Sequence, residues 1–113
     1  MLWAKITGEF EGIHFYKKAQ GEEKFLQHPH RHMFHYTIMI EQFHDDRDIE
    51  YIAFKRWIEK LIKTKGDLNH KSCEMIAREL SKEIRKKYPG RYVKIEIMED
   101  GENGTLLEKR YKG

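Results

Sequence analysis

Four histidines lie in the stretch HPHRHMFH at residues 28–35, directly before the apolar segment YTIMI. Residues two apart on a strand share a face, roughly 6.6 Å apart along the chain, so His30 and His32 can converge on one metal ion. His14 ends an earlier alternating segment, and it can approach this pair if the two segments form a hairpin. Three imidazoles with a vacant fourth position are typical of a catalytic zinc site rather than a structural one.

These histidines also have a simpler interpretation, because histidine clusters occur on solvated loops. The spacing of His30 and His32 therefore leaves both metal binding and surface exposure open. His28 and His35 are expected either to be solvated or to orient the metal ligands as hydrogen-bond partners. His44 and His70 lie in turn-like segments, where exposure to solvent is the expected state.

Two segments that hold the histidines alternate between apolar and polar residues, which predicts half-buried strands. In the first segment, apolar side chains recur at every second position from Leu2, and Gly8 suggests a bulge or a bend. The second segment covers residues 30–41. One face of this strand is expected to carry His30, His32, Phe34, Tyr36, Ile38 and Ile40, and the other Met33, His35, Thr37, Met39 and Glu41.

Helical spacing follows the second strand. Residues 49–65 carry an apolar stripe at three- and four-residue steps, with Asp48 as the candidate N-cap. Ser72 is the expected N-cap of a second helix that bears its own apolar stripe. The YPG sequence at residues 88–90 ends this helix.

Two more strands are predicted near the end of the chain, at residues 91–98 and 105–111. Turn signals between them are Asp100-Gly101 and Asn103-Gly104. The order strand, strand, helix, helix, strand, strand predicts an α+β fold, in which a four-stranded antiparallel sheet carries two helices on one face. An exposed edge in so small a sheet invites pairing with another subunit.

Cys73 and Glu99 are the other residues with potential chemistry. Cys73 is the single cysteine and lies on the apolar stripe of the second helix, which favours a structural thiol over a nucleophile. Glu99 follows the predicted third strand at an odd-numbered position, as do Ile95 and Ile97, so it is expected on the same face as these apolar residues. Such a carboxylate can simply begin a turn, or it can bind a paired N–H edge of a ligand through charge-assisted hydrogen bonds.

The length of 113 residues predicts one domain, residues 1–113. The 22 basic and 19 acidic residues leave a net charge of +3, which indicates a solvated surface and does not establish nucleic-acid binding. A localised basic pocket for an anion stays open. A single cysteine excludes an internal disulfide framework and fits the reducing cytosol, and neither a membrane-spanning run nor a signal-peptide core is visible.

Five segments in order are similar to motifs of one known family: FEGIH (10–14), HRHMF (30–34), IEYIAFK (49–55), KSCEMIAREL (71–80) and IEIMED (95–100). The corresponding family patterns are Phe-x-Ala-Ala-His, His-Gly-His-Asn-Tyr, Ile-Asp-Phe-x-x-Leu-Lys, Pro-Thr-Ser-Glu-Asn, and a last strand that ends in glutamate. Over nearly its whole length, the chain resembles the 6-pyruvoyl-tetrahydropterin synthase and 6-carboxytetrahydropterin synthase family, the latter serving queuosine and other deazapurine pathways.

The resemblance implies a tunnelling fold, with subunits joined edge to edge into a barrel that is usually a hexamer. It implies zinc on His14, His30 and His32. It also implies that Glu99 anchors the amide edge of a pterin-like base at a subunit interface, and it places Ser72 where the family keeps a hydroxyl near the substrate.

The sequence departs from the family at three places. Leu26 stands where the synthases carry a catalytic cysteine before the paired histidines. The Asp-His proton relay of the family is replaced by the shorter KTKGDLNHKS, in which Asp67 and His70 are the candidate remnants. The glycine between the zinc histidines is replaced by Arg31.

These features leave three functions open. The first is a zinc-dependent carbon–oxygen lyase for a reduced pterin or a triphosphate-bearing precursor, with Asp67, His70 or one of Glu22 and Glu23 as the base. The second is a non-catalytic binder of a pterin- or nucleotide-like ligand, sequestering or regulatory, with Arg31 near the phosphates. The third is a scaffold whose histidines are merely exposed.

Overall fold

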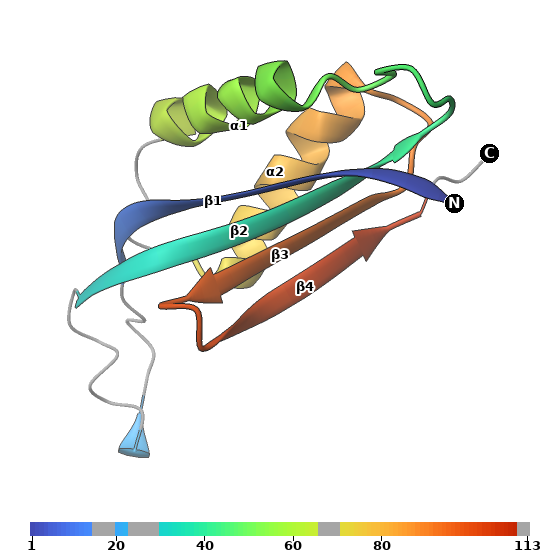
Figure 1. The fold of residues 1–113 in the computed structure, drawn as a ribbon. Coiled ribbons are helices and arrows are strands. Elements are labelled where there is room, and N and C mark those ends of the chain that lie inside the picture. The colour runs from blue at the N-terminus through green and yellow to red at the C-terminus, as the bar shows by residue number, and fades with distance from the viewer. Residues whose placement is uncertain (15–19, 23–29, 66–70, 111–113) are drawn as a thin grey trace.

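The computed structural model describes residues 1–14, 20–22, 30–65 and 71–110, with the backbone alone described at residues 13, 14, 30, 31 and 65. The elements are β1 (Leu2–His14), β2 (His30–Gln42), α1 (Tyr51–Lys65), α2 (Cys73–Lys87), β3 (Val93–Glu99) and β4 (Asn103–Lys109). All neighbouring strands are antiparallel in the order β1-β2-β3-β4, and both helices lie on one face of this sheet (Figure 1). The predicted α+β class and ββααββ order are therefore confirmed.

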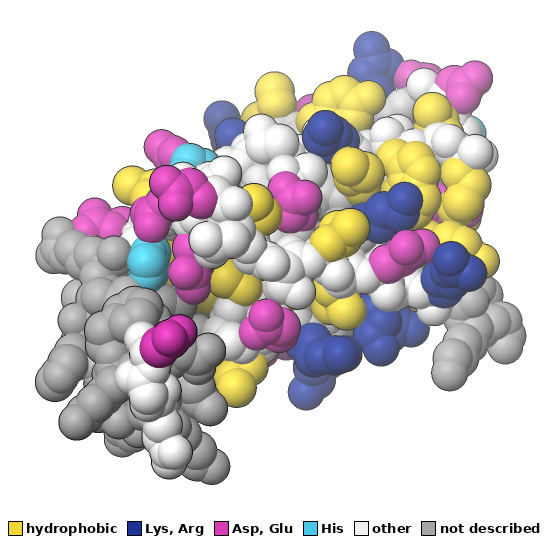
Figure 2. All heavy atoms as spheres, turned by 90° about the horizontal axis from the view of Figure 1, so that it is seen from below, with side chains coloured by type: hydrophobic (Ala, Val, Ile, Leu, Met, Phe, Trp, Pro, Cys, Tyr) yellow, Lys and Arg dark blue, Asp and Glu magenta, His cyan; other side chains and the backbone are white. Residues whose placement is uncertain are grey.

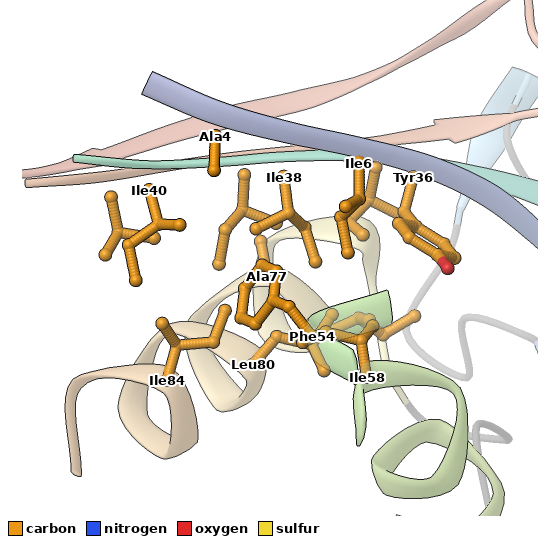
Figure 3. Close-up of a cluster of buried hydrophobic side chains, with 14 of the residues drawn as sticks. Ala4, Ile6, Tyr36, Ile38, Ile40, Phe54, Ile58, Ala77, Leu80 and Ile84 are labelled. Carbon is orange, nitrogen blue, oxygen red and sulfur yellow. The ribbon is translucent and has the colours of Figure 1, made fainter. Parts of the chain in front are cut away.

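The hydrophobic core lies between the sheet and the two helices (Figure 3). From the strands it receives Ala4, Ile6, Phe34, Tyr36, Ile38, Ile40, Val93, Ile95 and Ile97, and from the helices Phe54, Ile58, Cys73, Ile76, Ala77, Leu80 and Ile84. The alternation in the strands and the stripes in the helices predicted this set. Each large apolar side chain that is fully buried stabilises the fold by roughly 1.5–3 kcal/mol.

Of the two expectations for Gly8, a bulge or a bend, the bulge is wrong. The register of β1 with β2 continues through it, with Gly8 opposite Tyr36. The Tyr36 ring covers the glycine, since a β-carbon at this position would lie 2.4 Å from the Tyr36 hydroxyl oxygen. The absence of a side chain at Gly8 therefore makes room for a buried aromatic ring on the next strand.

The N-terminus of α1 is capped by a residue other than the predicted one. Glu50 accepts hydrogen bonds from the backbone N–H groups of Ile52 and Ala53 through its carboxylate, at 3.2 and 2.6 Å. Asp48, the expected cap, instead accepts from the backbone N–H of Phe43 at 2.7 Å and pairs with Arg91. No helix within the described residues has the length and apolar character needed to cross a lipid bilayer.

The ion pair of Asp48 and Arg91 ties the β2–α1 connection to the start of β3. The guanidinium donates to both carboxylate oxygens, at 2.6 and 3.2 Å, and also to the backbone oxygen of Glu41 at 2.9 Å. The hydrogen bond from Arg91, followed by the one from Phe43, lowers the pKa of Asp48 from 3.8 to about 2. The folded state therefore holds this carboxylate ionised more strongly than the unfolded chain does.

We expect Asp48→Asn to destabilise the protein at neutral pH by an amount that disappears in acid. Because the folded pKa lies below the unfolded one, the contribution of Asp48 is complete above pH 4 and is lost as the pH falls towards 2. Urea denaturation of both proteins between pH 6 and pH 2 measures the gap. Asp46→Asn is the control, since Asp46 pairs with Arg47 at the exposed surface. A gap independent of pH would contradict this assignment.

The β3–β4 turn uses one of the two predicted signals. Asp100 and Gly101 both have positive φ, at 54° and 72°. The backbone N–H of Glu102 donates to the backbone oxygen of Glu99 at 3.0 Å. Asn103 lies instead in β4, which begins two residues earlier than the predicted 105–111 and ends at Lys109. This tight turn fixes where Glu99 and Asp100 emerge from the sheet.

The face of the sheet opposite the helices has no helix packed on it within the described residues. Figure 2 shows hydrophobic side chains there interspersed with charges of both signs. On this face, neighbouring strands place four residues side by side in one row: Lys5, Met39, Lys94 and Glu108. His35 also lies on this face, 3.6 Å from Glu9, so it does not support the histidines of the opposite face.

Candidate metal and ligand site at the end of the sheet

The strand register brings the three predicted metal ligands to one end of the sheet. His14 lies opposite His30, and Gly12 lies opposite His32. Residues directly opposite in an antiparallel pair share a face, as do residues two apart on a strand. The register thus brings the backbone of all three histidines to one end of the sheet, whereas only the His32 side chain is among those described.

His32 is held by a carboxylate that the sequence analysis did not identify. Its Nδ1 lies 2.7 Å from Oδ2 of Asp100, and the other Asp100 oxygen accepts from the Met33 N–H at 3.0 Å. The hydrogen bond with His32, followed by the one with Met33, lowers the pKa of Asp100. Phe34 packs against the imidazole edge-to-face at 6.1 Å. The ring is therefore fixed by a hydrogen bond and by packing.

The orientation of His32 favours one tautomer. An Nδ1 proton donated to Asp100 leaves the lone pair on Nε2, and a metal-bound histidine is commonly held in this way by a carboxylate. Nε2 lies 3.7 Å from Oε2 of Glu99, beyond a direct hydrogen bond. His32 and Glu99 therefore lie close together where β2 begins and β3 ends.

Glu99 connects this point to the start of α2. Its Oε1 lies 3.8 Å from the sulfur of Cys73, which can donate its S–H. Burial, followed by the negative charges of Glu99 and Glu74, raises the pKa of Cys73 to about 12. The thiol therefore stays protonated at neutral pH, as the structural interpretation of Cys73 expected. The contact with Glu99 was not predicted.

We expect Cys73 to resist thiol reagents in the folded protein. A pKa raised from 9.0 to about 12 lowers the thiolate fraction near pH 8 on the order of a thousandfold, and burial slows access further. The measurement is the rate of reaction with a disulfide reagent. The same chain in urea is the matched control, because it contains no other cysteine. Equal rates in the two states would show that the thiol is neither buried nor suppressed.

Ser72 lies beside Cys73 and caps α2, as predicted from its position. Its hydroxyl oxygen accepts from the Met75 N–H at 3.2 Å. The ligand-contacting role implied by the family resemblance stays a prediction, since the observed bond is local to the helix. As an N-cap, Ser72 stabilises the helix by about 1 kcal/mol and thereby holds Cys73 against Glu99.

The remaining predicted site residues are not tested by the structure. Asp67 and His70 lie outside the described residues, as do Leu26 and His28, and the Arg31 side chain is not described. Within the described part of the chain, no group of three or more His, Cys, Asp or Glu side chains could hold a metal ion. His44 lies at the surface near Asp48, at 3.7 Å, as expected for a turn residue.

Neither a model of a known protein family nor a curated protein matches this sequence. The described geometry defines an α+β protein with a histidine, two carboxylates and a thiol gathered where β2, β3 and α2 meet. Any functional assignment therefore depends on this geometry and on the motifs in the sequence.

Proposed function

We propose that the chain is a divergent relative of the 6-pyruvoyl-tetrahydropterin and 6-carboxytetrahydropterin synthases, and that it binds a pterin- or purine-like ligand in a zinc-associated pocket. One observation carries the proposal: Asp100 holds Nδ1 of His32, so that Nε2 is directed toward Glu99. The ββααββ order supports it, since it is consistent with a tunnelling fold. The pairing of His14 with His30 in the strand register also supports it.

The donor set fits zinc. Neutral imidazole nitrogens are preferred zinc ligands, and a carboxylate on the far ring nitrogen is their usual partner. His14, His30 and His32 are the proposed ligands, with Asp100 orienting the last of them. When bound, zinc supplies a Lewis acid that polarises a ligand oxygen.

Glu99 is the proposed anchor for the ring of the ligand. A carboxylate can accept two N–H donors from the amide edge of a pterin or a purine, and such charge-assisted bonds are strong. Glu99 lies 3.8 Å from the sulfur of Cys73 and 3.7 Å from Nε2 of His32, so its carboxylate is positioned beside the proposed metal ligand. Arg31 is the proposed partner of ligand phosphates.

Binding and catalysis make different demands on such a pocket. Binding needs the metal ligands and the anchor, whereas a lyase also needs a positioned proton donor and acceptor, worth roughly a hundredfold to ten-thousandfold in rate. Asp67 and His70 are the proposed candidates for that role. We place ligand binding first because Leu26 stands where the synthases carry a catalytic cysteine. A sequestering or regulatory protein would need no more.

The proposal extends to a homo-oligomer in the cytoplasm. β1 and β4 form the two edges of the sheet, and within the described residues no strand pairs with their outer sides. Open edges of this kind can join between subunits. A hexamer or a related barrel would place Glu99 near a subunit interface.

The experiment is a titration of zinc-loaded protein with neopterin and with guanosine, followed by fluorescence. We expect Glu99→Gln to weaken binding about tenfold or more, since a charge-assisted bond contributes roughly 1.5–3 kcal/mol. Glu96→Gln is the matched control, because Glu96 lies on the same strand and on the opposite face. The control should leave the affinity unchanged.

Incubation with dihydroneopterin triphosphate then separates the two activities. Release of triphosphate that depends on zinc supports the lyase. A flat rate with the ligand still bound removes the lyase and leaves the binder. Absence of ligand binding, together with less than about one tenth of a zinc ion per chain, would refute the pocket itself.

A further inference from the structure

A basic groove lies between the C-terminal half of α2 and the end of β4. It has a volume of about 420 Å³ and is lined by Arg78, Ser81, Lys82, Arg85, Lys86 and Lys109. Five of these side chains are cationic, although the whole chain carries a net charge of only +3. The groove therefore concentrates positive charge that the composition does not reveal.

Helix periodicity and strand alternation bring these residues together. Arg78, Lys82 and Arg85 follow at steps of four and three along α2, so they share one side of the helix. Lys109 lies on β4 with the parity of Leu107, which packs against the core, so it faces the helix layer. Figure 1 shows α2 running over this part of the sheet, and α2 contacts both β3 and β4.

Few carboxylates neutralise the groove. Within the described residues, no ion pair involves Arg78, Lys82, Arg85 or Lys109, whereas Lys86 lies 3.7 Å from Glu83. Glu108 lines an adjoining hollow, but it lies 3.3 Å from Arg110. Like charges that converge without counter-ions repel one another, so a bound anion would stabilise this arrangement.

The helix dipole explains only part of the cluster. Arg85 and Lys86 belong to the last turn of α2, where cations interact favourably with the helix C-terminus. Arg78 and Lys82 lie earlier in the helix, and Lys109 belongs to another element. A structural role within α2 therefore leaves these three cations unexplained.

Ser81 provides an independent indication. Ser81 is a polar residue, yet its exposed fraction is only 2 %. Its hydroxyl has no hydrogen-bond partner among the described residues. A buried hydroxyl without a partner costs free energy, so such groups are uncommon unless a ligand or a water serves them. Ser81 is one of the residues that line the groove, so the unsatisfied hydroxyl belongs to its wall, although the oxygen itself is buried.

We propose that this groove binds the polyphosphate group of a small molecule. Two guanidinium groups can each grip a phosphate through two parallel hydrogen bonds, and three lysines supply further charge. The volume lies within the range of small-molecule sites. The lining residue of α2 nearest to Cys73 is Arg78, five positions further along the helix and roughly 7.5 Å along its axis, and neither Cys73 nor Glu99 lines the groove, so this site is distinct from the one at Glu99.

The test uses inorganic tripolyphosphate and metal-free protein, so that chelation of zinc plays no part. Calorimetry measures the affinity, and amide chemical shifts locate the site, with changes expected at residues 78–86 and at Lys109. We expect Lys82→Gln combined with Arg85→Gln to weaken binding about tenfold or more. Arg56→Gln combined with Lys60→Gln removes the same charges from the exposed side of α1, and this control should weaken binding less than about twofold.

The contrary outcomes are distinct. Equal losses in the two double variants would show that net charge alone attracts the anion and would overturn the proposal. Tighter binding of a short single-stranded RNA than of tripolyphosphate at the same salt concentration would overturn it in favour of a nucleic-acid surface. The experiment uses no zinc and leaves Glu99 intact. A negative result for tripolyphosphate therefore does not test the zinc-associated pocket, and a negative result for that pocket does not test the basic groove.

Discussion

Gly104→Ala is expected to lower the free energy of unfolding by about 3 kcal/mol, a large share of the roughly 5–15 kcal/mol that a domain of this size possesses. Gly104 lies in β4 opposite Met98. A β-carbon at this position would lie 1.9 Å from the backbone oxygen of Ile97 and 2.7 Å from the α-carbon of Met98. Because these neighbours are backbone atoms, the clash can be relieved only by separating β3 from β4.

Chemical denaturation measures this effect, and Gly101→Ala is the matched control in the same hairpin. A β-carbon at Gly101 would approach the His35 side chain no closer than 3.8 Å, so its cost comes from the positive φ alone, about 1 kcal/mol. A loss no greater for Gly104→Ala than for Gly101→Ala would contradict the argument. The comparison also concerns the candidate site, because the same hairpin presents Glu99 and Asp100.

The elements of the fold were predictable because their patterns are local. Alternation in β1 and β2 and the stripes of α1 and α2 each arise from one element meeting one core, so they can be read without knowledge of the neighbours. The N-cap of α2 followed from Ser72 alone. The cap of α1 was predicted wrongly, because Asp48 is recruited by Arg91 from a distant part of the chain.

The candidate site was predictable only in part. Strand parity and the register of β1 with β2 place the three histidines at one end of the sheet, as the hairpin hypothesis required. Asp100 was interpreted as a turn residue, and its bond to His32 depends on pairing between residues far apart in the chain. An acidic residue directly after Glu99 was the signal that could have identified this contact.

The basic groove was beyond prediction from periodicity. Its cations alternate with acidic residues along α2, which reads as an ordinary solvated helix face. Its distinctive charge arises only when β4 brings Lys109 next to that face. Sites built from two elements need the register and the packing of the sheet before they become visible.

His32→Ala is expected to lower the affinity for zinc by at least about a hundredfold, since it removes one of three proposed ligands. Asp100→Asn should lower it about tenfold to a hundredfold, the usual effect of removing the carboxylate that orients a ligating histidine. Asparagine can retain the bond from the Met33 N–H, and it tolerates the φ of 54° at this position. The loss in Asp100→Asn would therefore report on the His32 ring rather than on the turn.

The measurement is competition for zinc against a chromophoric chelator, which needs no knowledge of the ligand or the reaction. His35→Ala is the matched control, because His35 lies on the same strand, is partly exposed on the other face and contacts Glu9. An equal loss in this control would assign the zinc to surface histidines. An undiminished affinity in His32→Ala would remove His32 from the metal site. Glu99 would then lie beside an imidazole that serves packing alone, and the zinc-associated pocket would have no foundation.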